Sequence, residues 1–235
     1  MKKPYMKKLL IALTFLPVLA LANTAAITVT APIDANDYAS LQRGARTFVN
    51  SCLNCHSANY MRYNRLKDIG LTEAQIKDNL LFAGDKVGDT MQTAMNPKDA
   101  KKWFGVAPPD LSVEVRARGA DWVYAYMRGF YRDETTPTGW NNAVYDKVAM
   151  PHVLYELQGE QVMNHETHKL ELVKPGKLSP SEYNAFVGDL TNYMAFMAEP
   201  AKQQRKHLGL WALLFLGVLL VLAIKLKKEY WKDIK

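Results

Sequence analysis

The chain has 235 residues, of which 49% are hydrophobic and 23% are charged, and its formal net charge is +7. The positive excess lies at the two ends, because residues 23–200 contain 18 basic and 21 acidic side chains. This part of the chain is mildly acidic, so the basic isoelectric point does not indicate nucleic-acid binding. A mildly acidic domain is instead compatible with a cationic protein partner.

Residues 1–22 have the pattern of a secretory signal peptide. Four lysines precede the mostly apolar residues 9–21, and Ala20 and Ala22 give the small-x-small form of a cleavage site. We expect cleavage after Ala22 and export of residues 23–200 as one domain. An uncleaved N-terminal anchor remains the alternative.

A helix is expected over residues 36–51, and it leads directly into a C-x-x-C-H motif formed by Cys52, Cys55 and His56. This motif is the attachment signature of a c-type haem: each thiol can form a thioether with a haem vinyl group, and the imidazole binds the iron from one face. The chain has only these two cysteines, which excludes a Cys-rich zinc or iron–sulfur site. The alternative is a redox-active or disulfide-forming pair, which an exported domain and the trailing histidine disfavour.

Less regular structure is expected after the motif. A capping box begins a short helix over residues 72–80, and a further helix is expected over residues 121–128. The stretches 84–119 and 129–178 look poor in regular structure. Residues 162–173 could form a small hairpin, but Asn164 interrupts them, so we expect a surface excursion there. Loops of this length usually have a function, and wrapping haem edges or contacting partners would be sufficient reason.

The second axial ligand determines the chemistry of such a haem. Methionine would favour high-potential electron transfer, whereas an open position would permit ligand binding or peroxide chemistry. Met150 is the favoured candidate, because Pro151 biases it towards an extended loop and because it is far enough from His56 to approach the opposite haem face. Three histidines remain open as alternative ligands, namely His152, His165 and His168.

The strongest helical pattern covers residues 179–200. It begins with a capping box, continues with apolar residues at helical spacing and stops at Pro200. Met194 and Met197 belong to this apolar stripe, so they are expected to pack in the core.

A second long apolar run lies at residues 208–224, which carry no charge and would extend about 25 Å as a helix. Lys225 could snorkel and lengthen the run. We therefore expect a linker over residues 201–207, a transmembrane helix over residues 208–226 and a cytoplasmic tail over residues 227–235.

Five motifs follow one another along the exported part and its anchor. They are Cys52-Leu53-Asn54-Cys55-His56-Ser57, Ala107-Pro108-Pro109-Asp110-Leu111-Ser112, Arg116-Ala117-Arg118-Gly119, Met150-Pro151-His152 and Glu199-Pro200 before the anchor. In this order they resemble the motifs of the cytochrome c1 family over nearly the whole mature chain. The resemblance implies a mainly α fold, in which a cytochrome c type haem domain with long loops is followed by one C-terminal transmembrane helix.

The resemblance also implies a cofactor and roles for single residues. One haem c would be bound covalently through Cys52 and Cys55, with His56 and Met150 as iron ligands. Arg118 would pair with a haem propionate, and the guanidinium fork suits a carboxylate.

The function implied by the resemblance is electron transfer. Family members are the haem c subunit of the cytochrome bc1 complex, ubiquinol–cytochrome c reductase. They accept one electron from the Rieske iron–sulfur protein and pass it to a cytochrome c, while cytochrome b handles the other electron from ubiquinol. No substrate bond is broken on this subunit, so it is a non-catalytic redox subunit of an oxidoreductase complex.

The resemblance and the two apolar segments together predict a location. We expect a single-pass protein of a bacterial inner membrane, in contact with lipid, with its haem domain in the periplasm and with membership of a dimeric complex. Two other functions remain open: a free-standing membrane-anchored shuttle to a terminal oxidase, and a haem enzyme or gas sensor with a vacant sixth position.

Overall fold

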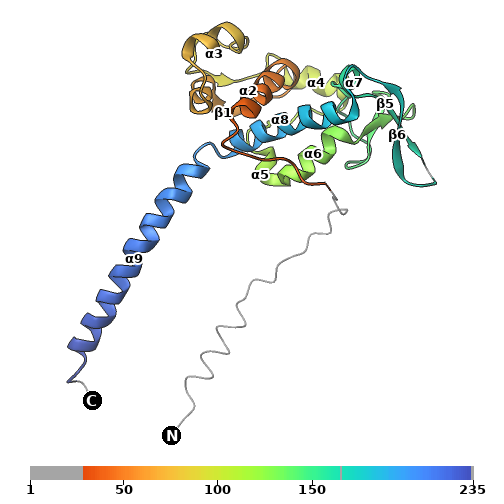
Figure 1. Cartoon of the computed structure of the whole chain (residues 1–235). Coiled ribbons are helices and arrows are strands. Elements are labelled where there is room, and N and C mark those ends of the chain that lie inside the picture. The colour runs from red at the N-terminus through yellow and green to blue at the C-terminus, as the bar shows by residue number, and fades with distance from the viewer. Residues whose placement is uncertain (1–28, 165, 234–235) are drawn as a thin grey trace.

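The computed structural model describes residues 29–164 and 166–233 (Figure 1). The predicted signal peptide, the possible ligand His165 and the last two residues of the predicted tail lie outside this part of the chain. The described residues form a mainly helical domain from which one long helix extends. The predicted fold class is therefore confirmed.

Helices make up most of the regular structure, and the strands occur in two-stranded antiparallel pairs. The helices are α2 (Tyr38–Thr47), the π-helical turn η1 (Phe48–Cys52), the 3-10 helix η2 (Tyr63–Ile69), α3 (Glu73–Asn79), α4 (Pro97–Phe104), α5 (Glu114–Arg118), α6 (Ala120–Arg128), α7 (Tyr155–Gln158), α8 (Pro180–Ala198) and α9 (Lys202–Tyr230). The pairs are β1 (Ala58–Arg62) with β2 (Thr90–Met91), β3 (Phe130–Arg132) with β4 (Trp140–Asn142), and β5 (Gly159–Asn164) with β6 (Lys169–Pro175).

Each of the four helices predicted for the exported domain is confirmed. The helix expected over residues 36–51 is α2 followed by η1, and those expected over residues 72–80 and 121–128 are α3 and α6. Both predicted capping boxes are formed, at the starts of α3 and α8. In a capping box, side chains accept hydrogen bonds from the free backbone amides of the first helical turn. The residues involved are three positions apart, so the start of such a helix can be predicted from the local sequence.

The helix α8 lies at the centre of the domain, with α2 and α6 packed against it (Figure 1). Met194 and Met197 on α8 are buried, as predicted. The rings of Tyr193 on α8 and Phe48 at the end of α2 are 5.6 Å apart, and both side chains are buried. Burial of large side chains of this kind stabilises the fold by about 1.5–3 kcal/mol each.

At Gly44 the backbones of α2 and α8 approach each other closely. A Cβ atom at this position would lie 2.1 Å from the carbonyl oxygen of Asp189 on α8. Only glycine fits such an approach, and it allows the two helices to hold the start of η1 against the core.

The stretches 84–119 and 129–178 contain more regular structure than predicted, so that prediction was wrong in part. The first holds β2, α4 and α5. The second holds β3, β4, α7 and a hairpin, where we expected a surface excursion. The hairpin is formed by β5 and β6, with Gly159 opposite Pro175 and Asn164 opposite Lys169. It projects from the end of the domain away from α9 (Figure 1).

The missed helix α4 has local signals at its start. The Asn96 side chain accepts a hydrogen bond from the amide of Lys98 at 2.9 Å, and Pro97 occupies the first turn. The apolar residues Ala100, Trp103 and Phe104 are at helical spacing, but they cover a single turn, and only Ala100 is buried.

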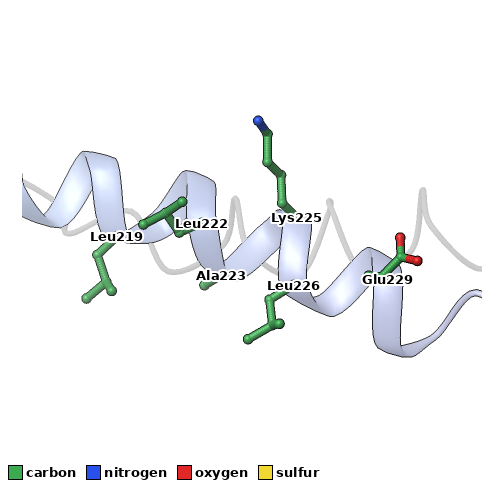
Figure 2. Close-up of a pocket in the computed structure, with 6 residues that line it drawn as sticks. All are labelled: Leu219, Leu222, Ala223, Lys225, Leu226 and Glu229. Carbon is green, nitrogen blue, oxygen red and sulfur yellow. The ribbon is translucent and has the colours of Figure 1, made fainter.

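The helix α9 extends away from the domain, and none of its side chains is buried (Figure 1). Figure 2 shows part of it with mostly aliphatic side chains pointing into open surroundings: Leu219, Leu222, Ala223, Lys225, Leu226 and Glu229. Its 29 residues extend about 43 Å, enough to cross a bilayer, and it is the one such helix in the described part of the chain. It begins at Lys202, so most of the predicted linker is helical.

Candidate functional site

The C-x-x-C-H motif lies in a tight turn at the end of η1. The amides of Cys55 and His56 both donate to the carbonyl oxygen of Cys52, at 3.1 and 2.9 Å. This single turn brings the two thiols and the imidazole into one short segment. π-helical turns are rare and are frequent at functional sites.

Both cysteines have free thiols. Cys52 is buried, and burial raises its pKa to about 12. Burial also raises the pKa of Cys55, which is only partly covered. Redox-active C-x-x-C pairs depend on a lowered cysteine pKa, so this environment argues against the alternative of a thiol–disulfide centre.

The imidazole of His56 is buried and has a defined tautomer. Its Nδ1 lies 2.8 Å from the carbonyl oxygen of Pro109. A carbonyl only accepts, so Nδ1 carries the proton and the lone pair of Nε2 is available to a metal. Burial lowers the pKa of His56, which favours the neutral ring. An outer hydrogen bond of this kind is the usual orienting contact of a metal-binding histidine.

The Pro109 carbonyl is held in place by bonds between its own segment and the residues after the motif. The amide of Leu111 donates to the carbonyl of Ser57 at 2.8 Å, and the amide of Asn59 donates to the carboxylate of Asp110 at 2.8 Å. The sequence predicted no role for Pro109 beyond its place in a family motif. The contact joins residues 53 positions apart, so no local signal reveals it.

Met150 lies in irregular chain between β4 and α7 and packs against the core. Its Sδ accepts a hydrogen bond from the hydroxyl of Tyr126 on α6, at a distance of 3.5 Å. Sequence reasoning did not identify this contact of Tyr126, because the two partners are 24 positions apart in the chain.

His152, the nearest rival to Met150 as a ligand, is almost fully buried in an aromatic environment. Its ring is stacked on Phe130 with centroids 4.7 Å apart, and Trp140 meets it edge-on at 5.0 Å. Neither ring nitrogen has a partner at hydrogen-bonding geometry. Burial lowers the pKa of His152 to about 4, and the neighbouring Gln158 side chain opposes this shift. The two aromatic contacts hold His152 as a packing residue of the loop that carries Met150.

Of the other two histidine alternatives, only His168 lies in the described part of the chain, and it gains no support from the fold. His168 is exposed near the tip of the β5–β6 hairpin, with φ at 53°. Within residues 29–164 and 166–233 no group of three or more His, Cys, Asp and Glu side chains could hold a metal ion.

Arg118 lies at the end of α5 and pairs with Glu114 one turn earlier. Its guanidinium also lies over the Trp122 ring, 4.4 Å from the centroid, and 5.7 Å from the Tyr145 centroid. The pairing of Arg118 with a haem propionate stays a prediction. The Arg118 side chain is 44% exposed, so the guanidinium remains accessible to a further carboxylate.

The groups described so far fit a c-type haem. Two free thiols one turn apart, an imidazole whose Nε2 is unprotonated and a thioether are the donors that such a haem uses. The imidazole follows η1, whereas the thioether lies beyond β4, so separate parts of the chain supply the two candidate axial ligands.

Comparison with known proteins gives one family model that matches residues 28–234, described as the cytochrome C1 family. A relative from Nitrosomonas europaea, named ammonia monooxygenase gamma subunit, is 52% identical over 97% of this chain and 98% of its own length. Cytochrome c1 of Allochromatium vinosum is 52% identical over 87% of this chain and 88% of its own. A mitochondrial protein of Candida albicans, named cytochrome b-c1 complex catalytic subunit, is 26% identical over 85% of this chain and 73% of its own.

Proposed function

Because the chain belongs to the cytochrome c1 family, we propose that it passes single electrons from a Rieske iron–sulfur protein to a cytochrome c within a ubiquinol-oxidising complex. It is an electron-transfer haem subunit of the bc1 type, and its cofactor is haem c. The observation that carries the proposal is the His56 geometry, in which the Pro109 carbonyl fixes the tautomer of a histidine inside a C-x-x-C-H turn.

In this proposal each residue of the site has a separate task. Cys52 and Cys55 would hold the cofactor covalently, and His56 and Met150 would bind its iron. When bound, haem c supplies one-electron chemistry between ferric and ferrous iron, and a thioether ligand favours a high potential. Arg118 is assigned to a haem propionate.

The chain's surroundings complete the proposal. The helix α9 anchors the protein by a single pass. We place the haem domain, residues 23–200, in the periplasm of a bacterial inner membrane and residues 227–235 in the cytoplasm, because residues 1–22 resemble a signal peptide. Cytochrome b and a second copy of the complex are the proposed neighbours. The net negative charge of the haem domain supports a cationic cytochrome c as electron acceptor.

One observation favours a second candidate assembly. The Nitrosomonas europaea relative is as identical to this chain as the Allochromatium vinosum cytochrome c1 is, and its name assigns it to a monooxygenase. A haem subunit that delivers electrons to a monooxygenase is therefore the alternative function. The free-standing electron shuttle is a third, since it would share the haem and the anchor.

Purification of the full chain in a mild detergent distinguishes these functions. The chain would carry an affinity tag after residue 235, and the control would be the same tag on an unrelated single-pass protein of that membrane. We expect a cytochrome b and a Rieske protein to co-purify in constant ratio with the chain. Recovery with monooxygenase subunits would support the alternative assembly, and recovery of the chain alone would support the shuttle.

A further inference from the structure

Side chains four residues apart line one face of α5 and α6 and continue into β3. We call this set the aromatic column: a charged pair, Glu114 and Arg118, is followed by three aromatic residues, Trp122, Tyr126 and Phe130. Side chains four residues apart on one helix lie above one another, which accounts for Glu114 with Arg118 on α5 and Trp122 with Tyr126 on α6. The contacts from α5 to α6 and from α6 to β3 are between separate elements and follow from how these elements pack.

The first half of the column fixes the ring of Tyr126 from one side. Glu114 pairs with Arg118, and the Arg118 guanidinium lies 4.4 Å from the centroid of Trp122. Trp122 is stacked on Tyr126, with centroids 5.0 Å apart and ring planes 11° from parallel. A planar cation on a tryptophan and a stacked pair of rings each favour one side-chain orientation.

The second half of the column connects Tyr126 to the loop that carries Met150. Phe130 meets the Tyr126 ring edge-on at 5.2 Å and is itself stacked on His152 at 4.7 Å. Tyr126 is thus in contact with a ring on each side, and its hydroxyl donates to Met150 Sδ at 3.5 Å. The loop is therefore held at two points, the sulfur of Met150 and the ring of His152.

We propose that Tyr126 is a positioning residue for the axial ligand Met150, and that its hydrogen bond to Sδ helps to set the reduction potential of the haem. The inference rests on the proposed function, in which Met150 binds the iron. A thioether sulfur has two lone pairs, so it can bind a metal with one and accept a weak hydrogen bond with the other. A hydrogen bond to sulfur withdraws electron density from it, which disfavours ferric iron relative to ferrous iron and raises the potential.

The size of the effect is limited by the strength of the bond. A single hydrogen bond in a protein changes an equilibrium constant by about tenfold at most, and only part of its strength differs between the ferric and ferrous states. Loss of the hydroxyl should lower the equilibrium constant for reduction by less than about tenfold, which for one electron is less than about 59 mV.

Two changes at Tyr126, measured in the haem-loaded full chain, test the proposal. Tyr126→Phe keeps the ring contacts and removes the donor, so the midpoint potential should fall. Site-specific 3-fluorotyrosine at the same position has a more acidic hydroxyl and donates more strongly, so the potential should rise. Tyr124→Phe is the matched control, because Tyr124 lies on the same helix and its hydroxyl donates to the carbonyl of Asn184 at 3.3 Å instead.

A second readout separates failure of this inference from failure of the proposed ligation. A low-spin ferric haem with a sulfur ligand has a sulfur-to-iron charge-transfer band, and the Met150 methyl group has a large hyperfine shift in proton NMR spectra. We expect both to be present in the unchanged protein and to shift in Tyr126→Phe but not in Tyr124→Phe. Suppose the unchanged protein shows the charge-transfer band and the shifted methyl signal. If neither Tyr126→Phe nor the fluorotyrosine variant then changes these signals or the midpoint potential, Tyr126 does not act on the sulfur. If the unchanged protein lacks the band and the methyl signal, Met150 is not the sixth ligand of the haem iron, and that part of the proposed function is wrong.

Discussion

The close contact between α2 and α8 makes Gly44→Ala a sharp test of how the fold holds the C-x-x-C-H turn. Gly44 is buried, and an added Cβ would meet the Asp189 carbonyl oxygen at 2.1 Å and the Tyr193 Cβ at 2.6 Å. Ordinary contact begins at 3.4 Å, so the first distance falls short by 1.3 Å. The obstructing oxygen belongs to the backbone of a helix and has no rotamer by which to move aside.

The expected cost follows from these distances. Overpacking of a well-packed core costs about 1–3 kcal/mol, and a backbone obstruction lies at the upper end of that range. Alanine recovers about 1 kcal/mol of helix propensity relative to glycine. The net loss should therefore be about 2 kcal/mol, and the shift of α2 should also displace η1, which ends at Cys52. Less covalent haem should accumulate as a result.

The measurement is urea unfolding of the detergent-solubilised holoprotein, followed by circular dichroism in the Soret region, together with haem staining after denaturing electrophoresis. Gly88→Ala is the control, because a Cβ at Gly88 meets no atom within 4 Å and its φ is not positive. That variant should change the free energy of unfolding by less than about 0.5 kcal/mol. Equal stabilities for the two variants would show that α2 and α8 do not meet as described.

Three further predictions concern the haem and the anchor. Met150→Leu should keep covalent haem but lower the potential and weaken the low-spin spectrum, whereas His152→Leu should leave that spectrum low-spin; the opposite result would make His152 the ligand. Cys52→Ala or Cys55→Ala should reduce or abolish the haem that survives denaturing electrophoresis, and full staining in both variants would contradict the attachment. Truncation after Pro200 should release a soluble haem protein from the membrane, because α9 is the one candidate span among the described residues; retention after a high-salt wash would contradict α9 as the anchor.

Those parts of the fold that have local signals could be predicted from the sequence. The capping boxes at Thr72 and Ser179 identified α3 and α8, and the apolar run identified α9. Such signals involve residues three or four positions apart, so they can be recognised in a short stretch of sequence. The helix α4 was missed although Asn96 and Pro97 mark its start, because its eight residues hold only one turn of apolar side chains at helical spacing.

The candidate site could be predicted only as a set of donor residues. The C-x-x-C-H motif gave His56 directly, but the contact that orients it comes from Pro109, which lies 53 residues away. In the same way the sequence left Met150 as one choice among methionines and histidines, and its role as an iron ligand stays a prediction. The fold adds the Tyr126 hydroxyl at its sulfur, a contact that the sequence did not indicate. Contacts of this kind depend on how segments pack, and a single sequence carries no record of them.

The five-residue helix α5 is linked through Glu199 to the anchor helix α9, and it also carries the first of the residues that lead to Met150. Arg116 on α5 pairs with Glu199 at 3.5 Å, and Glu199 also accepts from Arg205 in the first turns of α9 at 2.8 Å. Two residues further along α5, Arg118 begins the contacts that lead to Tyr126. The cations of the Glu199 pairs are largely exposed, and such pairs contribute about 0–1 kcal/mol each. The position of α5 must therefore depend on its packing against α8, so the Met150 side of the site is held by the domain itself, and α9 determines where the domain is attached rather than how it is built.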